Sequence, residues 1–313
     1  MAFVGYGGRR PPLTGGGGKH NMIRGRGSYL GVRANTMIEN TTLPITFRMN
    51  GASDIADWPT RSAATIRLRK SYAMAAGDLL GIDANPKTVK GRKLGIATGI
   101  MYMAPALSAG LKNLCSYASA GCLAACLNTS GKGGIPMVQN ARIRKAREFQ
   151  TNKPEFMIKL DYEIGRLALM AERDELLPAV RLNGTTDVLW EREKFIDADG
   201  VLWPNLMAKH STVQFYDYTK VPIRYRRNLP ANYDLTFSLS ESNDDDAMEA
   251  LELGHNVAAV FYDIPETFKG YDVIIGDESD ARFLDEKGVF VGLTVKRTKG
   301  ENGRHVDTTG FVR

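Results

Sequence analysis

The stretch NVAAVFYD, residues 256–263, is a nearly unbroken apolar run that ends on an aspartate. It is too short for a typical helix and too continuously apolar for a strand with one face in solvent. Such a run is typical of a strand that is buried on both faces in a parallel sheet. The second half of the chain repeats the pattern in AVRLNGTTD (179–187), VQFYDYTK (213–220), YDLTFSLSE (233–241), YDVIIGDE (271–278) and GVFVGLTVK (288–296). The repetition predicts an α/β fold, a (β/α) barrel or partial barrel with mostly parallel strands.

Polar side chains stand where most of these expected strands end. In a (β/α) barrel, active sites are assembled at the rim formed by the carboxyl ends of the strands. Taken singly, such residues are more often turn or helix-capping residues. Taken as a set they favour a site, and the candidate catalytic residues are Asn183, Asp187, Asp217, Lys220, Glu241 and Asp277.

Earlier parts of the chain predict further elements. A strand is expected at 41–50, another within 93–105, and two helices within 136–150 and 154–177. One face of the second helix carries apolar residues at helical spacing, namely Phe156, Leu160, Ile164 and Leu167.

The first 35 residues differ from the rest because they combine glycine, proline and arginine with few residues able to form a core. They predict a flexible, basic arm. The arm is a candidate contact for nucleic acid or for a neighbouring subunit, and a tail without a role is the alternative. Residues 36–313 are expected to form a single barrel-like α/β domain with a cysteine-rich metal loop at 113–134.

The composition is that of an ordinary soluble protein, with 43% hydrophobic and 24% charged residues. Disordered, coiled-coil and collagen-like classes are therefore excluded for the bulk of the chain. The chain has no apolar run of membrane-spanning length and no signal-peptide core at its start, so we expect a cytoplasmic protein without a membrane partner. The formal net charge of +6 favours the approach of phosphate-bearing partners without requiring it, and a basic surface with no nucleic-acid groove ranks ahead of a dedicated groove.

All three cysteines of the chain, Cys115, Cys122 and Cys126, fall in one short window with the pattern C-x6-C-x3-C. In a reducing compartment they remain thiols, and clustered thiols are soft ligands that select iron–sulfur centres, zinc or copper(I). Three ligands leave one iron of a [4Fe–4S] cluster open, whereas an electron-transfer cluster normally uses four cysteines. An iron–sulfur cluster is therefore the first interpretation.

Two other interpretations remain open. Zinc would need a fourth ligand, and the chain offers only His20, His210, His255 and His305, none with convincing local spacing. The cysteines could also be buried thiols that pack as small apolar residues. Zinc ranks second and unmetallated thiols third.

A glycine-rich loop, NTSGKGGIP, follows the third cysteine and leads into a basic helix. Backbone amides at such a helix start can hold a phosphate or carboxylate. The loop is not a P-loop, because Lys132 is followed by glycine. A plain loop is the alternative to a cofactor site, whose candidate residues are Asn128, Ser130, Gly131 and Lys132, with Arg181 as a further anion-binding group.

Several long motifs occur in an order that resembles a family of bacteriophage and prophage proteins labelled gene product 88-like. They are LCSYASAGCLAACLNTSGKG, VQNARIRKAREF, AVRLNGTTDVLWE, VQFYDYTK, LTFSLSE, NVAAVF and IIGDESDARFLD, followed by GVFVGLTVK. The resemblance covers roughly residues 85–313. The label of the family implies a phage origin, and so the cytoplasm of an infected bacterial host, but no particular activity.

A looser resemblance is to radical S-adenosylmethionine enzymes, which also place three cysteines in a loop before a parallel (β/α) barrel. Their open iron binds the amino and carboxylate groups of S-adenosylmethionine. The chain departs from their C-x3-C-x2-C spacing and has no aromatic residue just before Cys126. The resemblance implies a [4Fe–4S] cluster as cofactor, with S-adenosylmethionine as a second one.

These patterns together predict a phage-type [4Fe–4S] enzyme of radical-SAM-like architecture with an unknown substrate. Its open iron would act as a Lewis acid or electron donor, which implies an electron-donor protein as partner. A nucleic-acid-binding or virion-associated protein with a structural metal is one alternative, in which the basic arm contacts phosphates. An electron-carrier or redox-sensing iron–sulfur protein is the other.

Overall fold

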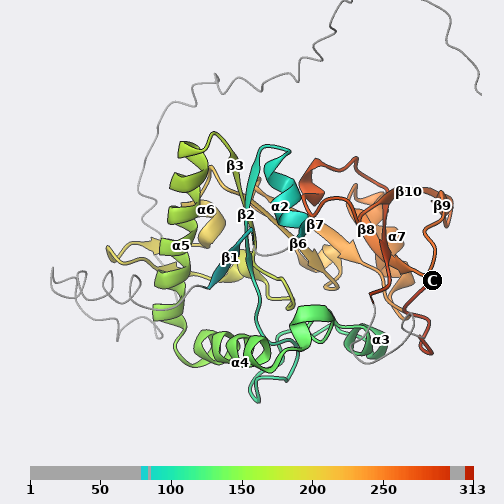
Figure 1. Ribbon diagram of the computed structural model, residues 1–313, viewed down its shortest axis with the longest axis horizontal. Coiled ribbons are helices and arrows are strands. Elements are labelled where there is room, and N and C mark those ends of the chain that lie inside the picture. The colour runs from blue at the N-terminus through green and yellow to red at the C-terminus, as the bar shows by residue number, and fades with distance from the viewer. Residues whose placement is uncertain (1–78, 84–85, 297–306) are drawn as a thin grey trace, which may run out of the picture. The chain divides into compact units, whose positions relative to one another are not determined.

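The computed structural model describes residues 79–83, 86–296 and 307–313. They form an open, mostly parallel sheet with helices packed against it (Figure 1). The mostly parallel α/β fold predicted from the apolar runs is therefore confirmed. The predicted arm at 1–35 and the predicted strand at 41–50 lie outside the described residues.

Nine strands make the main sheet, in the spatial order β1-β2-β3-β6-β7-β8-β11-β10-β9. Six parallel strands cross its centre in chain order: β2 (Ile96–Met101), β3 (Leu177–Arg181), β6 (Gln214–Thr219), β7 (Tyr233–Ser238), β8 (Asn256–Phe261) and β11 (Phe290–Thr294). β10 (Tyr271–Ile275) pairs parallel with β11 on its other side. β1 (Leu80–Ile82) and β9 (Thr267–Phe268) pair antiparallel at the two edges.

The sheet does not close into a barrel. Its central strands follow one another in chain order, as barrel strands do, which is why the sequence pattern suggested closure. The short strands β1 and β9 occupy the outer edges and pair antiparallel with β2 and β10. Because those hydrogen-bonding edges are already used, β2 and β10 do not pair with each other, and the expectation of a closed barrel is wrong.

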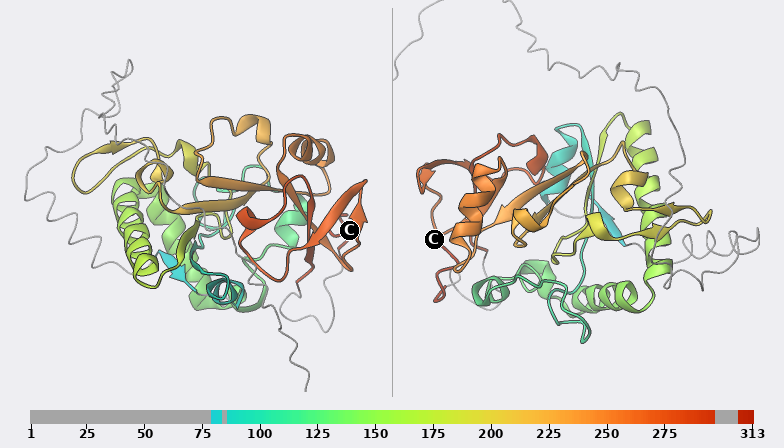
Figure 2. Two further views of the ribbon diagram at one scale, coloured as in Figure 1. Left: turned by 90° about the horizontal axis from the view of Figure 1, so that it is seen from above. Right: turned by 180° about the vertical axis from the view of Figure 1, so that it is seen from behind.

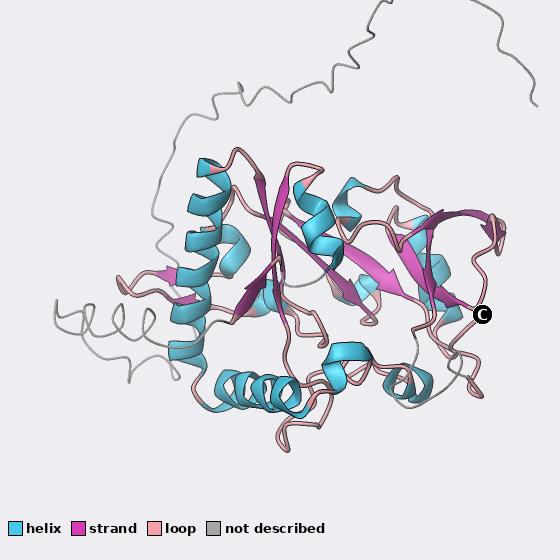
Figure 3. Cartoon of the chain, in the orientation of Figure 1, coloured by secondary structure: helices cyan, strands magenta, loops and turns pink. Residues whose placement is uncertain are grey.

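Helices fill the connections between the strands (Figure 3). They are α2 (Pro86–Arg92), α3 (Ala120–Ala124), α4 (Pro136–Thr151), α5 (Lys153–Arg173), α6 (Leu206–Lys209) and α7 (Asp244–Glu252). Single 3-10 turns occur at η1 (Gly131–Gly134), η2 (Trp190–Arg192), η3 (Ile223–Tyr225) and η4 (Arg282–Leu284), and β4 (Phe195–Ile196) pairs with β5 (Leu202–Trp203) as a separate ribbon.

The two long helices match the predicted segments. Proline stands at the first turn of both α4 and α5, where its missing N–H costs nothing. α5 ends four residues earlier than predicted, because Glu175 adopts a left-handed backbone conformation with φ of 55° and turns the chain into β3.

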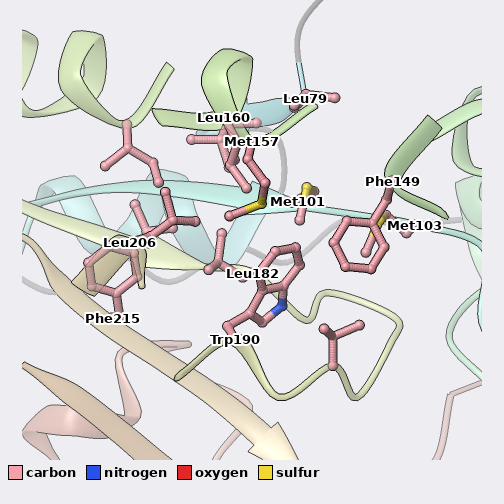
Figure 4. Packing of buried hydrophobic residues seen from close by; sticks show 14 of the residues in the cluster. Leu79, Met101, Met103, Phe149, Met157, Leu160, Leu182, Trp190, Leu206 and Phe215 are labelled. Atoms are coloured by element: carbon pink, nitrogen blue, oxygen red, sulfur yellow. The ribbon is translucent and has the colours of Figure 1, made fainter. Parts of the chain in front are cut away.

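The buried core lies between α5 and one face of the sheet. The four apolar residues predicted to share one helix face are all fully buried, namely Phe156, Leu160, Ile164 and Leu167. They belong to a cluster in which the Trp190 ring lies 5.1 Å from the Phe149 ring, centroid to centroid (Figure 4). On the opposite face, Ile96, Ala179 and Tyr216 pack with Ala281.

Strand alternation assigns each residue to one of these faces. In β6, Phe215 joins the α5 core, while Tyr216 faces the other way. Asp217 and Tyr218 continue the alternation, and this places them on opposite sides of the sheet.

Within the part of the chain that the structure describes, no helix has both the length and the apolar character needed to cross a membrane.

The buried side of α5 gives a direct test of the core. Replacing Phe156 with Ala should lower the free energy of unfolding by about 3–5 kcal/mol, because a fully buried ring is lost and leaves a cavity. Leu169→Ala, on the same helix but 68% exposed, is the matched control and should change it by less than about 0.5 kcal/mol. Urea denaturation followed by circular dichroism measures both, and equal effects would contradict the assigned helix face.

Candidate functional site

A cavity of about 250 Å³ lies at the carboxyl edge of the parallel strands. Its wall includes residues that end or follow β3, β6, β7, β10 and β11, together with Lys87 of α2. This is the edge at which open α/β sheets bind their ligands.

The segment that follows β2 forms another side of this cavity. It runs along the same edge of the sheet from Tyr102 to the start of α4, and the views from front and back agree on this placement (Figures 1 and 2). Cys115, Cys122 and Cys126 all line the cavity. The three cysteines that are close in sequence therefore also share one space.

Contacts from distant parts of the chain hold α3, which carries Cys122. Ser119 caps the helix by accepting a hydrogen bond from the Cys122 amide at 3.2 Å. Glu241 accepts from the Ser119 hydroxyl at 2.7 Å and from the Gly121 amide at 2.8 Å. A Cβ at Gly121 would lie 2.3 Å from the Thr309 hydroxyl oxygen and 2.5 Å from the Phe311 Cβ, so this close approach requires glycine.

The loop after Cys126 is fixed by a second set of contacts. The Asn128 side chain donates to Gln139 Oε1 at 2.9 Å and accepts from Arg142 at 2.9 Å. Asn128 is therefore buried as part of the loop's own structure. Ser130, Gly131 and Lys132 lie at or within η1 and do not line the cavity.

Two of the three sulfur atoms accept backbone hydrogen bonds. The Ala106 amide donates to Cys115 Sγ at 3.4 Å, and the Asn128 amide donates to Cys126 Sγ at 3.5 Å. Burial raises the pKa of Cys115 to about 12 and also raises the pKa of Cys126. Without a bound cation, both groups are neutral thiols near pH 7.

The wall opposite the cysteines carries paired charges. Arg181 Nη1 lies 3.2 Å from both carboxylate oxygens of Asp280, and its guanidinium stacks 4.6 Å from the Tyr218 ring centroid. Asp280 also accepts from the Tyr216 hydroxyl at 3.2 Å. Arg181 is thus held rigidly at the end of β3 by an ion pair and an aromatic face.

A second charged group involves Asp277, which accepts from the Thr294 amide at 2.8 Å and from Lys296 at 2.9 Å. Lys87 reaches the same carboxylate at 3.2 Å. Burial opposes ionisation of Asp277, but these donors outweigh it and lower the pKa of the carboxyl. Asp277 is therefore ionised throughout the physiological range.

Lys220 also lines the cavity. Its ammonium group donates to the Ser238 hydroxyl at 2.6 Å and lies 5.4 Å from the Phe311 ring centroid. Its backbone amide donates to Asp187 Oδ2 at 2.7 Å, and burial raises the pKa of Asp187. Lys220 thus brings a positive charge to the cavity wall.

Asn183 lines the cavity but uses its side chain to shape the loop after β3. Its Oδ1 accepts from the Thr186 hydroxyl, the Val188 amide and the Trp190 indole at 2.9–3.0 Å. The loop that carries Asp187 is thereby tied to the buried core.

Asp217 lies on the other face of the sheet, away from the cavity lining. It accepts from the Asn183 amide at 2.7 Å and from the Tyr233 hydroxyl at 2.8 Å. Burial raises the pKa of Asp217 to about 7. Its role is to position the strand ends, since strand alternation turns its carboxyl towards the core.

The structure brings together eight of the predicted site residues, and all of them line the cavity: Cys115, Cys122, Cys126, Arg181, Asn183, Asp187, Lys220 and Asp277. Asp217 and Glu241 support the site from outside the cavity lining, as do Asn128, Ser130, Gly131 and Lys132 in their loop. Sequence reasoning missed Lys87, Tyr218, Ser238 and Asp280. Strand alternation could have indicated which face of the sheet borders the cavity, and hence Tyr218. No local sequence pattern indicates that α2, which carries Lys87, and the turn after β10, which carries Asp280, lie beside the same cavity.

No group of three or more His, Cys, Asp or Glu side chains that could hold a metal ion occurs among the described residues. His210 bonds Asp161 and His255 bonds the Leu235 carbonyl, so both have partners other than the cysteines. His20 and His305 lie outside the described residues. Three thiols, two of which accept hydrogen bonds from backbone amides, are the kind of ligand that a soft metal centre prefers. In this structure, however, the three sulfur atoms are not arranged around one point where a single ion could bind.

The fold and cavity define an α/β protein with a cysteine-lined site, which also holds charged side chains, at the carboxyl edge of an open, mostly parallel sheet. The chain belongs to the phage gene-product family described as Gene product 88, whose family model matches residues 79–312. The family resemblance seen in the motifs is thus confirmed. No curated protein and no solved structure matches the chain.

The raised pKa of Asp217 makes stability depend on pH. The folded state binds this proton more tightly than the unfolded state, whose Asp pKa is about 3.9, so the stabilising contribution is lost as pH rises towards 7. Asp217→Asn removes the charge and should gain stability relative to the unchanged protein between about pH 4 and pH 7. Urea denaturation of both proteins across this range measures the difference, and a pH-independent difference would contradict the assigned burial.

The raised pKa of Cys115 predicts slow alkylation. In folded protein prepared without metal, iodoacetamide at mildly alkaline pH should modify Cys115 more than about 100-fold more slowly than in urea, because almost no thiolate is present. Mass spectrometry of the peptide that contains Cys115 gives both rates. Similar rates in the two conditions would show that this sulfur is open to solvent.

Proposed function

We propose that the protein is an iron–sulfur enzyme in which Cys115, Cys122 and Cys126 hold a [4Fe–4S] cluster in the cavity at the carboxyl edge of the sheet. One observation carries the proposal: all the cysteines of the chain line a single cavity, and charged side chains, among them Arg181, Lys220 and Asp277, line it with them among apolar residues. Thiols that merely fill the core would not need these charged side chains beside them.

The sulfur environment supports a cluster over a single ion. A zinc ion draws each thiolate to about 2.3 Å from one point, and the described residues contain no such group. A cube of iron and sulfide spaces its cysteine sulfurs further apart, and all three cysteines line one cavity of about 250 Å³. Amide hydrogen bonds to Cys115 and Cys126 are of the kind that tunes iron–sulfur centres.

When bound by three cysteines, such a cluster supplies an open iron that can act as a Lewis acid or pass an electron. The chain itself supplies the binding groups around it. Lys220 and Arg181 hold an anionic part of a ligand, and the ionised Asp277 accepts hydrogen bonds from a neutral or cationic part. Asp187, whose pKa is raised, is the candidate for moving a proton.

S-adenosylmethionine is the proposed co-substrate, because the radical S-adenosylmethionine resemblance pairs it with a three-cysteine cluster, and the ionised Asp277 and cationic Lys220 of the same cavity can bind its remaining polar groups. The cysteine segment follows the first parallel strand, β2, and the sheet winds on from it in chain order. This order is what the radical S-adenosylmethionine resemblance implies. Incubation of the reduced protein with S-adenosylmethionine, followed by chromatography of the products, tests for its cleavage and separates an enzyme from an electron carrier.

A structural metal in a nucleic-acid-binding protein is the second candidate function. The net charge of +6 favours it. Protein purified anaerobically would then be colourless and contain stoichiometric zinc, whereas the proposed cluster gives a brown protein that contains iron and sulfide.

Cys122 offers the sharpest test of the cluster. Cys122→Ala should abolish the visible absorbance of anaerobically purified protein and reduce its iron content at least several-fold, because only two thiolates remain. Iron and sulfide analysis, with electron paramagnetic resonance of the reduced protein, provides the measurement.

Ser116→Ala is the matched control, since Ser116 is an exposed neighbour of Cys115 in the same segment. It should keep the full iron content. Unchanged iron in Cys122→Ala, or loss of iron from the control alone, would refute the assignment of the ligands.

A further inference from the structure

A surface groove lies beside the cavity and is not used by the proposed chemistry. It is lined chiefly by Tyr117, Leu189, Arg192, Val221, Tyr225 and Arg227. The tyrosines come from the cysteine segment and from η3, which are far apart in sequence. Tertiary structure alone therefore brings the two rings to one groove.

The groove and the cavity share their dividing wall. Three segments, 115–117, 187–189 and 220–221, contribute to both: the first residue of each lines the cavity and the last lines the groove. A ligand bound along the groove would therefore contact residues that lie one or two positions in sequence from residues of the cysteine-lined cavity.

Two aromatic side chains of the groove are open to solvent. Tyr117 is 47% exposed and Tyr225 is 50% exposed. Arg224 stacks on Tyr225, with its guanidinium carbon 4.9 Å from the ring centroid. Exposed rings beside arginines form a platform for flat, π-stacking ligands.

The charge of the groove is positive. Arg224 is neutralised by ion pairs with Asp246 and Glu249. Arg192 and Arg227 donate to the backbone carbonyls of Tyr225 and Arg224, and no described carboxylate pairs with either. Two uncompensated guanidinium groups therefore flank the tyrosines.

We propose that this groove binds single-stranded nucleic acid, with bases stacked on Tyr117 and Tyr225 and phosphates near Arg192 and Arg227. Sequence-tolerant binding of single strands uses this combination of aromatic platforms and positive charge. A duplex keeps its bases stacked on each other, and an acidic peptide has no flat bases, so neither uses both features. Binding in the groove does not depend on the proposed function. Only the substrate class rests on it, because a nucleotide of the bound strand would reach the cavity in which the proposed enzyme acts.

Fluorescence anisotropy of a labelled oligothymidylate of about twelve nucleotides tests this inference with the full chain. Tyr117→Ala combined with Tyr225→Ala should weaken binding at least about tenfold, whereas Tyr117→Phe combined with Tyr225→Phe should preserve it because stacking needs the ring and not the hydroxyl. Arg227→Glu should weaken binding and flatten its dependence on salt.

Arg173→Glu is the matched charge control, because Arg173 is exposed at the end of α5 and does not line the groove. It should leave affinity within about twofold of the unchanged protein if binding is local to the groove. Equal affinity of the Ala and Phe pairs, or a preference for duplex DNA or polyglutamate over the single strand, would overturn the inference. Iron content is measured on each sample, so failure of the groove is distinguishable from failure of the cluster.

Discussion

Parallel pairing of the central strands is the constraint on which the rest of the structure depends. Because β2, β3, β6, β7, β8 and β11 all run in the same direction, their carboxyl ends meet at one edge of the sheet. Side chains as far apart in sequence as Lys87 and Phe311 therefore share one cavity. Its volume is small enough that the charges on one wall act on groups bound at the other.

The cysteine segment depends on this edge without being part of the sheet. With only one short helix of its own, α3, it takes its shape from Glu241, from the C-terminal residues Thr309 and Phe311, and from the Asn128 contacts. Such contacts from other parts of the chain are typical of a site whose binding side chains are held in place before the bound group arrives. The same support leaves Tyr117 exposed next to Cys115, which joins the groove to the cavity.

Much of the fold was predictable because buried parallel strands leave continuous apolar runs, and α5 leaves a clear helical period in Phe156, Leu160 and Ile164. The site was predictable where chemistry is concentrated in one stretch, as for the cysteines, or at strand ends, as for Asp187 and Lys220. Asp217 shows the limit of that reasoning. Position at a strand end is not enough, because a shift of one residue along a strand reverses the face on which the side chain lies.

By itself the sequence determined the kind of sheet, the long helices, the family and the thiol-rich segment, since each of these leaves a local pattern of residue types. Only the tertiary structure decided that the sheet stays open, that Lys87 and Asp280 join the site, and that Tyr117 and Tyr225 border one groove. These outcomes depend on pairings between distant segments, and no local run of residues encodes the distance between two parts of a folded chain.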